Sequence, residues 1–279
     1  MRVALKIAYV GTGYHGSQVQ PDVATIEGEL FNALTDLEII EDPKSARFSS
    51  SGRTDAGVHA REQVVAFDTE KPNLAIPRVV NSKLPNSIWA WAYAEVPDDF
   101  DPRRWAVGRR YRYVMSGEQY DISKIRSASK VLVGEHDFAN FCNKGEEKST
   151  VRNVEKIDVR VSGTLTKIDI QANSFLWNMV RKMVSGLTMV GSGVRDEEWL
   201  NQMLEPESYE EGLESAPAYG LTLMEVIYPD PIDWCEDSYA IRRADENVYD
   251  YMIRHRVMAE VMDHLVSREQ VQNPSSCFK

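Results

Sequence analysis

Short segments in which apolar residues occupy every second position constrain the fold of this chain most strongly. At the N-terminus Val3, Leu5, Ile7 and Tyr9 alternate with other residues, which is the period of a β-strand with one buried face. Similar short segments predict further strands at 47–50, 63–69, 88–96, 109–116, 154–161 and 165–172. In the fourth strand, at 88–96, Trp89, Trp91 and Tyr93 share one face, and we expect this aromatic face to pack in the core.

Helical spacing of apolar residues occurs in only a few segments. It predicts helices at about 25–39, 122–132, 176–190 and 246–266, each with one apolar stripe. Strand-rich segments interrupted by a few helices predict an α+β fold rather than a doubly wound parallel sheet. After Pro229-Asp230-Pro231 the chain becomes acidic, so we expect residues 231–279 to form a connection and a helical extension packed on the body.

The net charge of −11 over 279 residues argues, taken alone, against a nucleic-acid binder, because phosphate contacts require Lys and Arg. The charge is unevenly distributed. Eight basic and two acidic residues lie between Arg103 and Lys130, whereas fifteen acidic and three basic residues lie between Arg195 and Glu246. A basic face on an acidic protein is therefore possible.

Several classes of protein are disfavoured by what the sequence lacks. No apolar run approaches the roughly 20 residues that span a bilayer, and residues 1–6 lack the apolar core of a signal peptide. Cys142, Cys235 and Cys277 are scattered and odd in number, which favours unpaired thiols in a reducing cytoplasm. The five histidines never pair with cysteine at metal-ligand spacing. We therefore expect a cytoplasmic protein without a membrane segment or a metal site.

One loop concentrates residues that could carry chemistry. Gly52-Arg53-Thr54-Asp55-Ala56-Gly57-Val58-His59-Ala60 places a carboxylate, a guanidinium and two glycines between predicted strands. The glycines would let the backbone turn tightly and approach a ligand. An Asp in such a loop is more often a turn former than a catalyst, so the physical signal alone is weak.

This nine-residue loop resembles the signature loop of the TruA family of tRNA pseudouridine synthases. Other segments agree with that family in order and approximate spacing. They are the N-terminal strand with 11–16, Phe100-Asp101-Pro102-Arg103, Arg110-Tyr111-Arg112-Tyr113, His136-Asp137-Phe138, Asn173-Ser174-Phe175-Leu176, Met179-Val180-Arg181 and 216–221. The resemblance covers residues 2 to about 230, and the segment 18–30 is similar to archaeal members.

The resemblance implies two similar α+β halves, 1–105 and 106–230, whose antiparallel sheets join around a central RNA-binding active-site cleft. It implies a homodimer that binds tRNA and uses neither cofactor nor metal. It also implies an isomerase that converts uridine to pseudouridine in the anticodon stem-loop, at tRNA positions 38, 39 and 40. The acidic C-terminal extension is not part of the common family pattern.

The resemblance also assigns roles in the reaction. Asp55 matches the catalytic aspartate, a nucleophile toward C1′ or C6 or a base for a glycal route. Arg181 matches the arginine that pairs with it, since a neighbouring guanidinium favours the ionised carboxylate. Tyr111 matches the tyrosine that stacks on the target base and could accept the C5 proton. Without the resemblance, Arg181 would be expected to be a solvated helix charge and Tyr111 a core aromatic.

The remaining substrate contacts follow from the same resemblance. Leu221 matches an apolar residue against the other side of the base, and Arg53 matches an arginine that helps to displace the target nucleotide, which must leave its stack to react. Arg103, Arg109 and Arg110 are expected to contact tRNA. One departure is Ser17, which stands where the family commonly has Trp or Phe.

Three alternatives stay open at the level of the sequence. One is a family member acting on other tRNA uridines. Another is a non-catalytic RNA-binding module, which would not need Asp55, Arg181 and Tyr111 together. The third is an Asp-dependent nucleoside hydrolase, which usually needs a second carboxylate, and the loop holds none.

Overall fold

The computed structural model describes residues 1–143 and 149–265. Cys277 and the predicted end of the last helix at 266 lie outside these residues. The helices are α1 (Ile26–Asp36), α2 (Pro77–Val80), α3 (Ile122–Val131), α4 (Met179–Gly191), α5 (Glu197–Gln202), α6 (Ser238–Leu265) and the 3-10 turns η1 (Ala139–Phe141) and η2 (Ala218–Gly220). The strands are β1 (Arg2–Tyr9), β2 (Ser49–Ser50), β3 (His59–Asp68), β4 (Ile88–Glu95), β5 (Gly108–Ser116), β6 (Gly134–Asp137), β7 (Val151–Ser162), β8 (Leu165–Ala172), β9 (Leu221–Ile227) and β10 (Cys235–Glu236).

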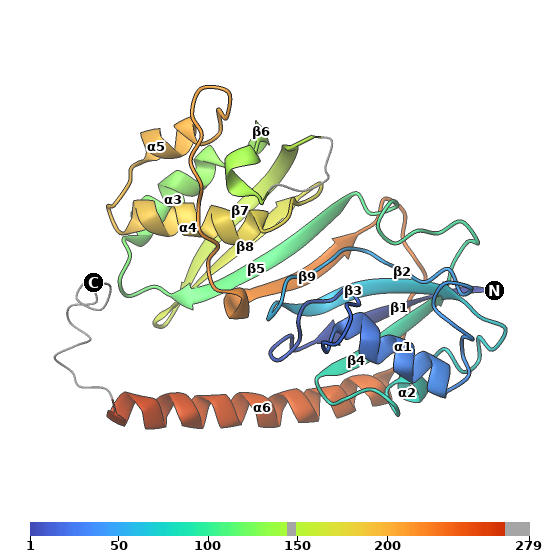
Figure 1. Cartoon of the computed structure of the whole chain (residues 1–279). Coiled ribbons are helices and arrows are strands. Elements are labelled where there is room, and N and C mark those ends of the chain that lie inside the picture. The colour runs from blue at the N-terminus through green and yellow to red at the C-terminus, as the bar shows by residue number, and fades with distance from the viewer. Residues whose placement is uncertain (144–148, 266–279) are drawn as a thin grey trace.

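All ten strands of the described residues belong to one continuous sheet, which confirms the predicted α+β class. The strand order is β10-β4-β1-β3-β9-β5-β8-β7-β6, with β2 paired to β3 (Figure 1). Neighbouring strands are antiparallel except β3 and β9, which run parallel and are joined in register at His59 with Thr222 and at Ala60 with Leu223. This short parallel pair is the junction between strands from the first and second parts of the chain.

Two hydrophobic clusters lie on either side of that junction. One contains Leu5, Leu30 and Phe67, from β1, α1 and β3. The other contains Phe138 and Met183, which come from the segments around β6 and α4. Each cluster also takes residues from the other part of the chain, because Leu223 lies in the first cluster and Val58 in the second. The division of the chain at 105/106 stays a prediction.

The aromatic face of β4 differs from expectation. Ile88, Ala90, Ala92 and Ala94 are the buried residues of this strand, while the aromatic side chains between them are half-buried. The Lys6 ammonium lies 5.0 Å from the ring centroid of Trp91 and 4.9 Å from that of Trp234. The sequence pattern identified the two faces of the strand but assigned the core to the wrong one, since the small alanines lie on the buried face, where the strand packs against α2.

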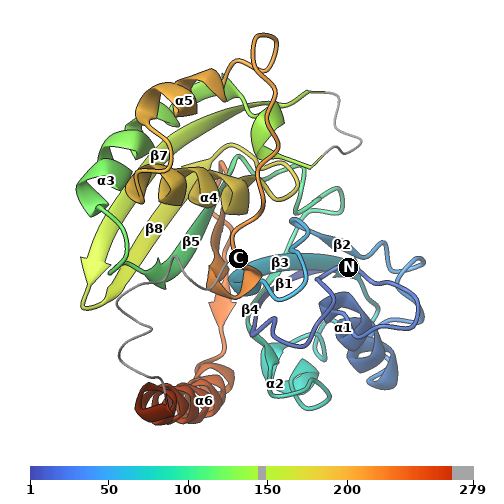
Figure 2. The ribbon, with the colours of Figure 1, turned by 60° about the vertical axis from the view of Figure 1, so that its left-hand side comes forward.

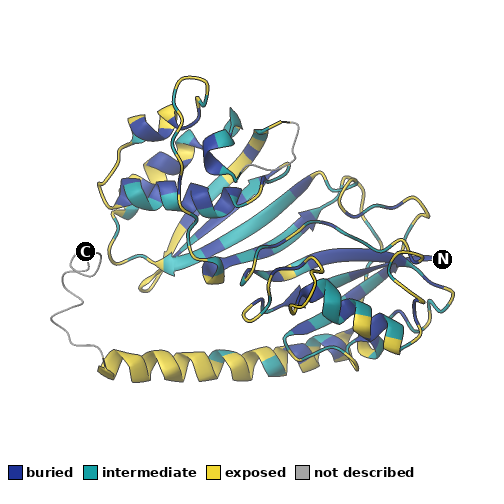
Figure 3. Cartoon of the chain, in the orientation of Figure 1, coloured by how far each residue is buried: buried dark blue, intermediate teal, exposed yellow. Residues whose placement is uncertain are grey.

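The helix α6 corrects a second expectation. It begins earlier than predicted, at Ser238, and contacts β4 and α2 only near its start, where Ala240 and Ala244 are buried. Beyond Ala244 almost every side chain is exposed, and the helix runs past the body without packing on it (Figures 2 and 3). No helix among residues 1–143 and 149–265 is long and apolar enough to cross a membrane.

Candidate active site

The signature loop is fixed by buried hydrogen bonds on both sides of Thr54. Its N–H donates to Ser17 Oγ at 2.8 Å, and its carbonyl accepts from the Ser17 N–H at 3.0 Å. The Tyr9 hydroxyl lies 2.8 Å from Thr54 Oγ1. Ser17 is only 3% exposed, and its hydroxyl satisfies the buried N–H of Thr54. The residue that departs from the family pattern therefore helps to hold the segment next to Asp55.

His59 ties the end of the loop to the turn before β9. Its Nδ1 accepts a hydrogen bond from the Gly11 N–H at 3.0 Å, so the ring proton lies on Nε2, which donates to the Tyr219 carbonyl at 3.1 Å. Burial lowers the pKa of His59, so the ring is neutral at physiological pH. Both ring nitrogens are engaged in structural contacts, and the described residues contain no cluster of three metal-ligating side chains.

Asp55 receives one hydrogen bond on each carboxylate oxygen. Arg181 Nη1 lies 3.2 Å from Oδ2, and Trp177 Nε1 donates to Oδ1 at 3.1 Å. The side chains of Arg181 and Asp55 are 17% and 25% exposed, so the pair is partly withdrawn from water. A solvated Arg181 is thereby excluded. The carboxylate remains accessible enough for a substrate to reach it.

Arg181 is itself oriented by two neighbours. Its Nε donates to the Ala216 carbonyl at 2.6 Å, and its Nη1 donates to Asn178 Oδ1 at 2.9 Å. Asn178 precedes α4 and has a left-handed backbone, with φ of 65°, a conformation that Asn tolerates better than most residues. This turn lets Trp177 and Arg181 approach Asp55 from the same helix start.

Tyr111 lies between the two hydrophobic clusters and packs against both. Its ring meets Phe175 edge-to-face, with centroids 5.2 Å apart. Burial raises the pKa of Tyr111 to about 12, with a smaller contribution from the charge of Asp55. The phenol is therefore protonated at neutral pH, which suits an aromatic surface better than a proton acceptor.

Leu221 is the first residue of β9 and faces the core. It is 5% exposed and pairs across the strand with Tyr113, whose hydroxyl donates to the Pro217 carbonyl at 2.9 Å. Leu221 is therefore a buried core residue in this structure.

Arg109 and Arg110 are engaged in contacts within the protein. Arg109 donates to the backbone carbonyls of Ser51 and Arg103 at 3.0 and 2.9 Å, and burial lowers its pKa. Arg110 forms two hydrogen bonds to Glu225, at 3.1 and 2.8 Å. Because side chains alternate along a strand, Arg110 points to the face opposite Tyr111. The structure therefore brings Arg109 to the signature loop as a brace and does not bring Arg110 to Asp55.

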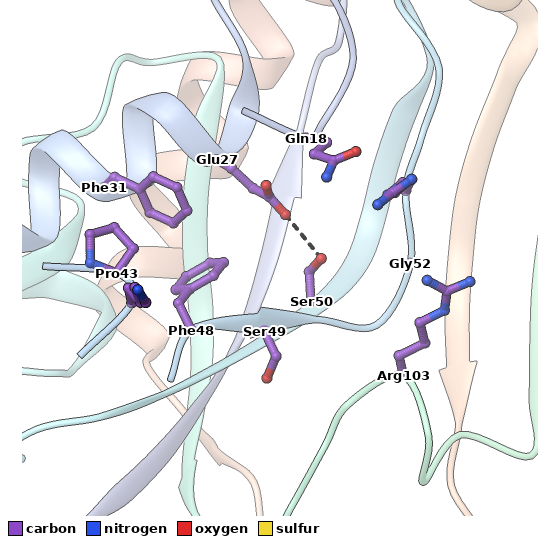
Figure 4. A pocket seen from close by; sticks show the side chains of 11 residues that line it. Gln18, Glu27, Phe31, Pro43, Phe48, Ser49, Ser50, Gly52 and Arg103 are labelled. Carbon is purple, nitrogen blue, oxygen red and sulfur yellow. Dashed lines mark hydrogen bonds between the residues drawn. The ribbon is translucent and has the colours of Figure 1, made fainter. Parts of the chain in front are cut away.

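Arg53 and Arg103 remain exposed cations beside the loop. Both line a cavity of about 380 Å³ that also contains Phe31, Phe48 and Glu27 (Figure 4). The Ser50 hydroxyl donates to Glu27 Oε1 at 3.0 Å in the same cavity. Among the described residues neither guanidinium is held by a hydrogen bond or an ion pair. These two cations are therefore available to bind phosphate. Arg53 is only two residues from Asp55 in the sequence.

Known proteins that resemble this chain decide its family. The chain is 66% identical over 269 residues to "tRNA pseudouridine synthase A" of Methanococcoides burtonii, covering 96% of this chain and 98% of that protein. It is also 66% identical to the protein of that name from Methanosarcina acetivorans, over 96% and 100% of the two chains, and 40% identical to that from Thermococcus sibiricus over the same shares. The chain belongs to the tRNA pseudouridine synthase A family.

The family model for tRNA pseudouridine synthases also matches residues 128–229. The expected class of enzyme, an isomerase that forms pseudouridine, is therefore confirmed. The alignment with the Methanococcoides protein spans 269 of 279 residues. Most of α6 therefore has a counterpart in that relative. Among solved structures, a chain of a Cbf5-Nop10-Gar1 complex aligns with a TM-score of 0.33 and 13% identity, over 67% and 54% of the two chains.

In this member of the tRNA pseudouridine synthase A family, Trp177 contacts Asp55 although no sequence pattern singles it out. A tryptophan between an apolar helix start and a strand end has the appearance of a core residue. Its contact with Asp55 depends on bringing together residues 122 positions apart. Its place directly before the Asn that caps a helix is the one local feature that marks it.

Proposed function

We propose that this protein isomerises uridine to pseudouridine in the anticodon stem-loop of tRNA, at positions 38, 39 and 40, with Asp55 as the catalytic carboxylate. The observation that carries the proposal is the Asp55 carboxylate, held by Arg181 at 3.2 Å within the family's signature loop. The 66% identity to a relative named for tRNA pseudouridine formation supports the reaction. The location within tRNA rests on the resemblance to the TruA family.

The reaction conserves every atom of the substrate. The N1–C1′ bond breaks, the uracil turns, and a C5–C1′ bond forms while C5 loses a proton and N1 gains one. An ionised carboxylate can attack C1′ or C6, or remove a proton to open a glycal route. Tyr111 supplies an aromatic surface for the base. Arg53 and Arg103 supply positive charge for the tRNA backbone beside the reacting nucleotide.

We also propose that the protein acts as a homodimer, as members of the family do, and that α6 contributes to the interface. Along its exposed part, Val248, Tyr251, Met258, Met262 and Leu265 recur at spacings that continue a seven-residue repeat through His255. All five apolar side chains are at least 36% exposed. A stripe with this period is typical of a helix that packs along another helix, and a second copy carries the same stripe.

The decisive experiment maps pseudouridine in unmodified tRNA incubated with the pure protein. We expect new pseudouridine at positions 38 to 40 and none in a transcript lacking uridine at those positions. Pseudouridine elsewhere in tRNA would place the protein among relatives with other targets. RNA binding without any pseudouridine would identify a binding module instead.

A further inference from the structure

Trp177 is an unusual residue in the neighbourhood of Asp55. It lies directly before Asn178, the residue that caps α4, and is 53% exposed, although tryptophan is rarely left so accessible without a reason. Its backbone is fixed on both sides, since its carbonyl accepts from the Asn143 N–H at 3.0 Å and Asn178 follows in a left-handed conformation. The exposed ring therefore occupies a defined place and is not a loosely attached surface side chain.

The two oxygens of Asp55 are held by donors with different geometry. Arg181 alone would leave the carboxylate free to turn about its Cβ–Cγ bond, because it contacts only Oδ2. Trp177 contacts Oδ1, so the plane of the carboxylate is fixed when both bonds are present. Both donors come from the start of one helix and keep their separation. This arrangement resembles other sites in which a neighbouring donor fixes the orientation of a reacting group.

We propose that Trp177 is a positioning residue for Asp55, and this inference rests on the proposed function. The indole N–H cannot accept a proton and does not ionise at physiological pH. It can therefore act only through the direction in which the carboxylate lone pairs point. Misplacing a reacting atom by about 1 Å can slow a reaction about 100-fold, so loss of one of two orienting bonds should be visible in the chemical step.

Two variants distinguish the effect of the hydrogen-bond donor from that of the aromatic ring. Trp177→Phe keeps an aromatic surface but removes the donor, and Trp177→His keeps a ring N–H on a smaller ring. We expect Trp177→Phe to lower the single-turnover rate at saturating tRNA about 10- to 100-fold, with the KM changed less than about twofold. Trp177→His should lose no more than the square root of the factor that Trp177→Phe loses, so a 100-fold loss would shrink to about 10-fold or less. Recovery would not follow if the side chain served only to fill space.

Trp91→Phe is the matched control. Trp91 is a half-buried tryptophan whose Nε1 donates to the Arg61 carbonyl at 3.2 Å, on a strand that does not carry Asp55. This variant loses the same N–H, and we expect wild-type turnover. Circular dichroism and urea unfolding of all three variants establish that each is folded before its rate is compared.

The outcomes distinguish this inference from the proposed function. If the wild-type protein forms pseudouridine and Trp177→Phe does so at the wild-type rate, the positioning role is wrong. If Trp177→Phe is unaffected while Trp177→His raises the KM, Trp177 is a stacking surface for RNA. If the wild-type protein forms no pseudouridine under any condition tested, the proposed function fails first.

Discussion

Arg181 Nη1 and Asp55 Oδ2 lie 3.2 Å apart although 126 residues separate them in the chain. The contact joins a loop that precedes β3 to the first turn of α4. It is made possible by the parallel pairing of β3 with β9, which brings the two parts of the sheet together at the signature loop. The ion pair therefore depends on the pairing of β3 with β9, which joins the two parts of the sheet.

The first prediction concerns the cation of this pair. Arg181→Met should remove three hydrogen bonds, including that to the Ala216 carbonyl, and leave a partly buried carboxylate without its cation. We expect the rate at neutral pH to fall at least about 100-fold and the free energy of unfolding to drop by about 1–3 kcal/mol. Single-turnover assays and urea unfolding measure the two effects. Arg181→Lys should keep the charge and restore part of the rate. An unchanged rate in Arg181→Met would remove Arg181 from the site.

The second prediction tests the carboxylate. Asp55→Asn is nearly isosteric, so the loop and tRNA binding should persist, but an amide can neither carry the charge nor act as the nucleophile. We expect pseudouridine formation to fall below detection while the dissociation constant for tRNA changes less than about threefold. Asp99→Asn, at an exposed position outside the loop, serves as the control. Turnover like that of the wild type in Asp55→Asn would refute the assignment.

The third prediction follows from the protonation of Tyr111. Because burial raises its pKa to about 12, the phenol stays protonated between pH 7 and 9, and its phenolate fraction is small throughout. Tyr111→Phe should therefore keep tRNA affinity and a pH–rate profile parallel to that of the wild type in this range. If the phenolate removed the C5 proton, the wild-type rate would rise about tenfold per pH unit and only Tyr111→Phe would lose that rise. Tyr111→Ala should weaken binding, since the stacking surface is lost.

The fourth prediction concerns the exposed cations. The double variant Arg53→Gln with Arg103→Gln should weaken tRNA binding, and the slope of log affinity against log salt should fall by about 1–2. The rate at saturating tRNA should change much less, because phosphate contacts position the RNA. Arg110→Gln is the comparison, since Glu225 already holds that guanidinium. If Arg110→Gln weakened tRNA binding and lowered the salt slope while the double variant changed neither, tRNA would bind on the other face of the sheet.

The fifth prediction tests the exposed stripe of α6. Met258→Glu with Met262→Glu places two charges on the stripe, where the side chains are 45% and 56% exposed in the single chain. We expect sedimentation to show loss of dimer in favour of monomer. Val257 is similarly exposed, at 55%, but lies about 100° around the helix axis from Met258, off the stripe. Val257→Glu should therefore leave the dimer intact. A wild-type protein that is monomeric at all concentrations would exclude this interface.

The sequence by itself determined most of the local structure. Alternation at Val3 to Tyr9 and along 165–172 identified strands that the structure has within a residue or two. Helical spacing identified the segments of α1, α3 and α4 for the same reason: the period of apolar residues is set by local geometry. The signature loop identified Asp55 as the residue to examine, because its residue types are unusual as a set.

Only the tertiary structure decided how those segments serve one another. Trp177 reaches Asp55, Arg109 braces the loop through backbone carbonyls, and Arg110 is neutralised by Glu225. Each of these contacts joins residues far apart in the chain. Local periodicity records which face of a segment is apolar, and it does not record which segment will cover that face. For the same reason, helical spacing indicated a helix in the C-terminal extension, but it did not show that the helix extends beyond the body that was expected to cover it.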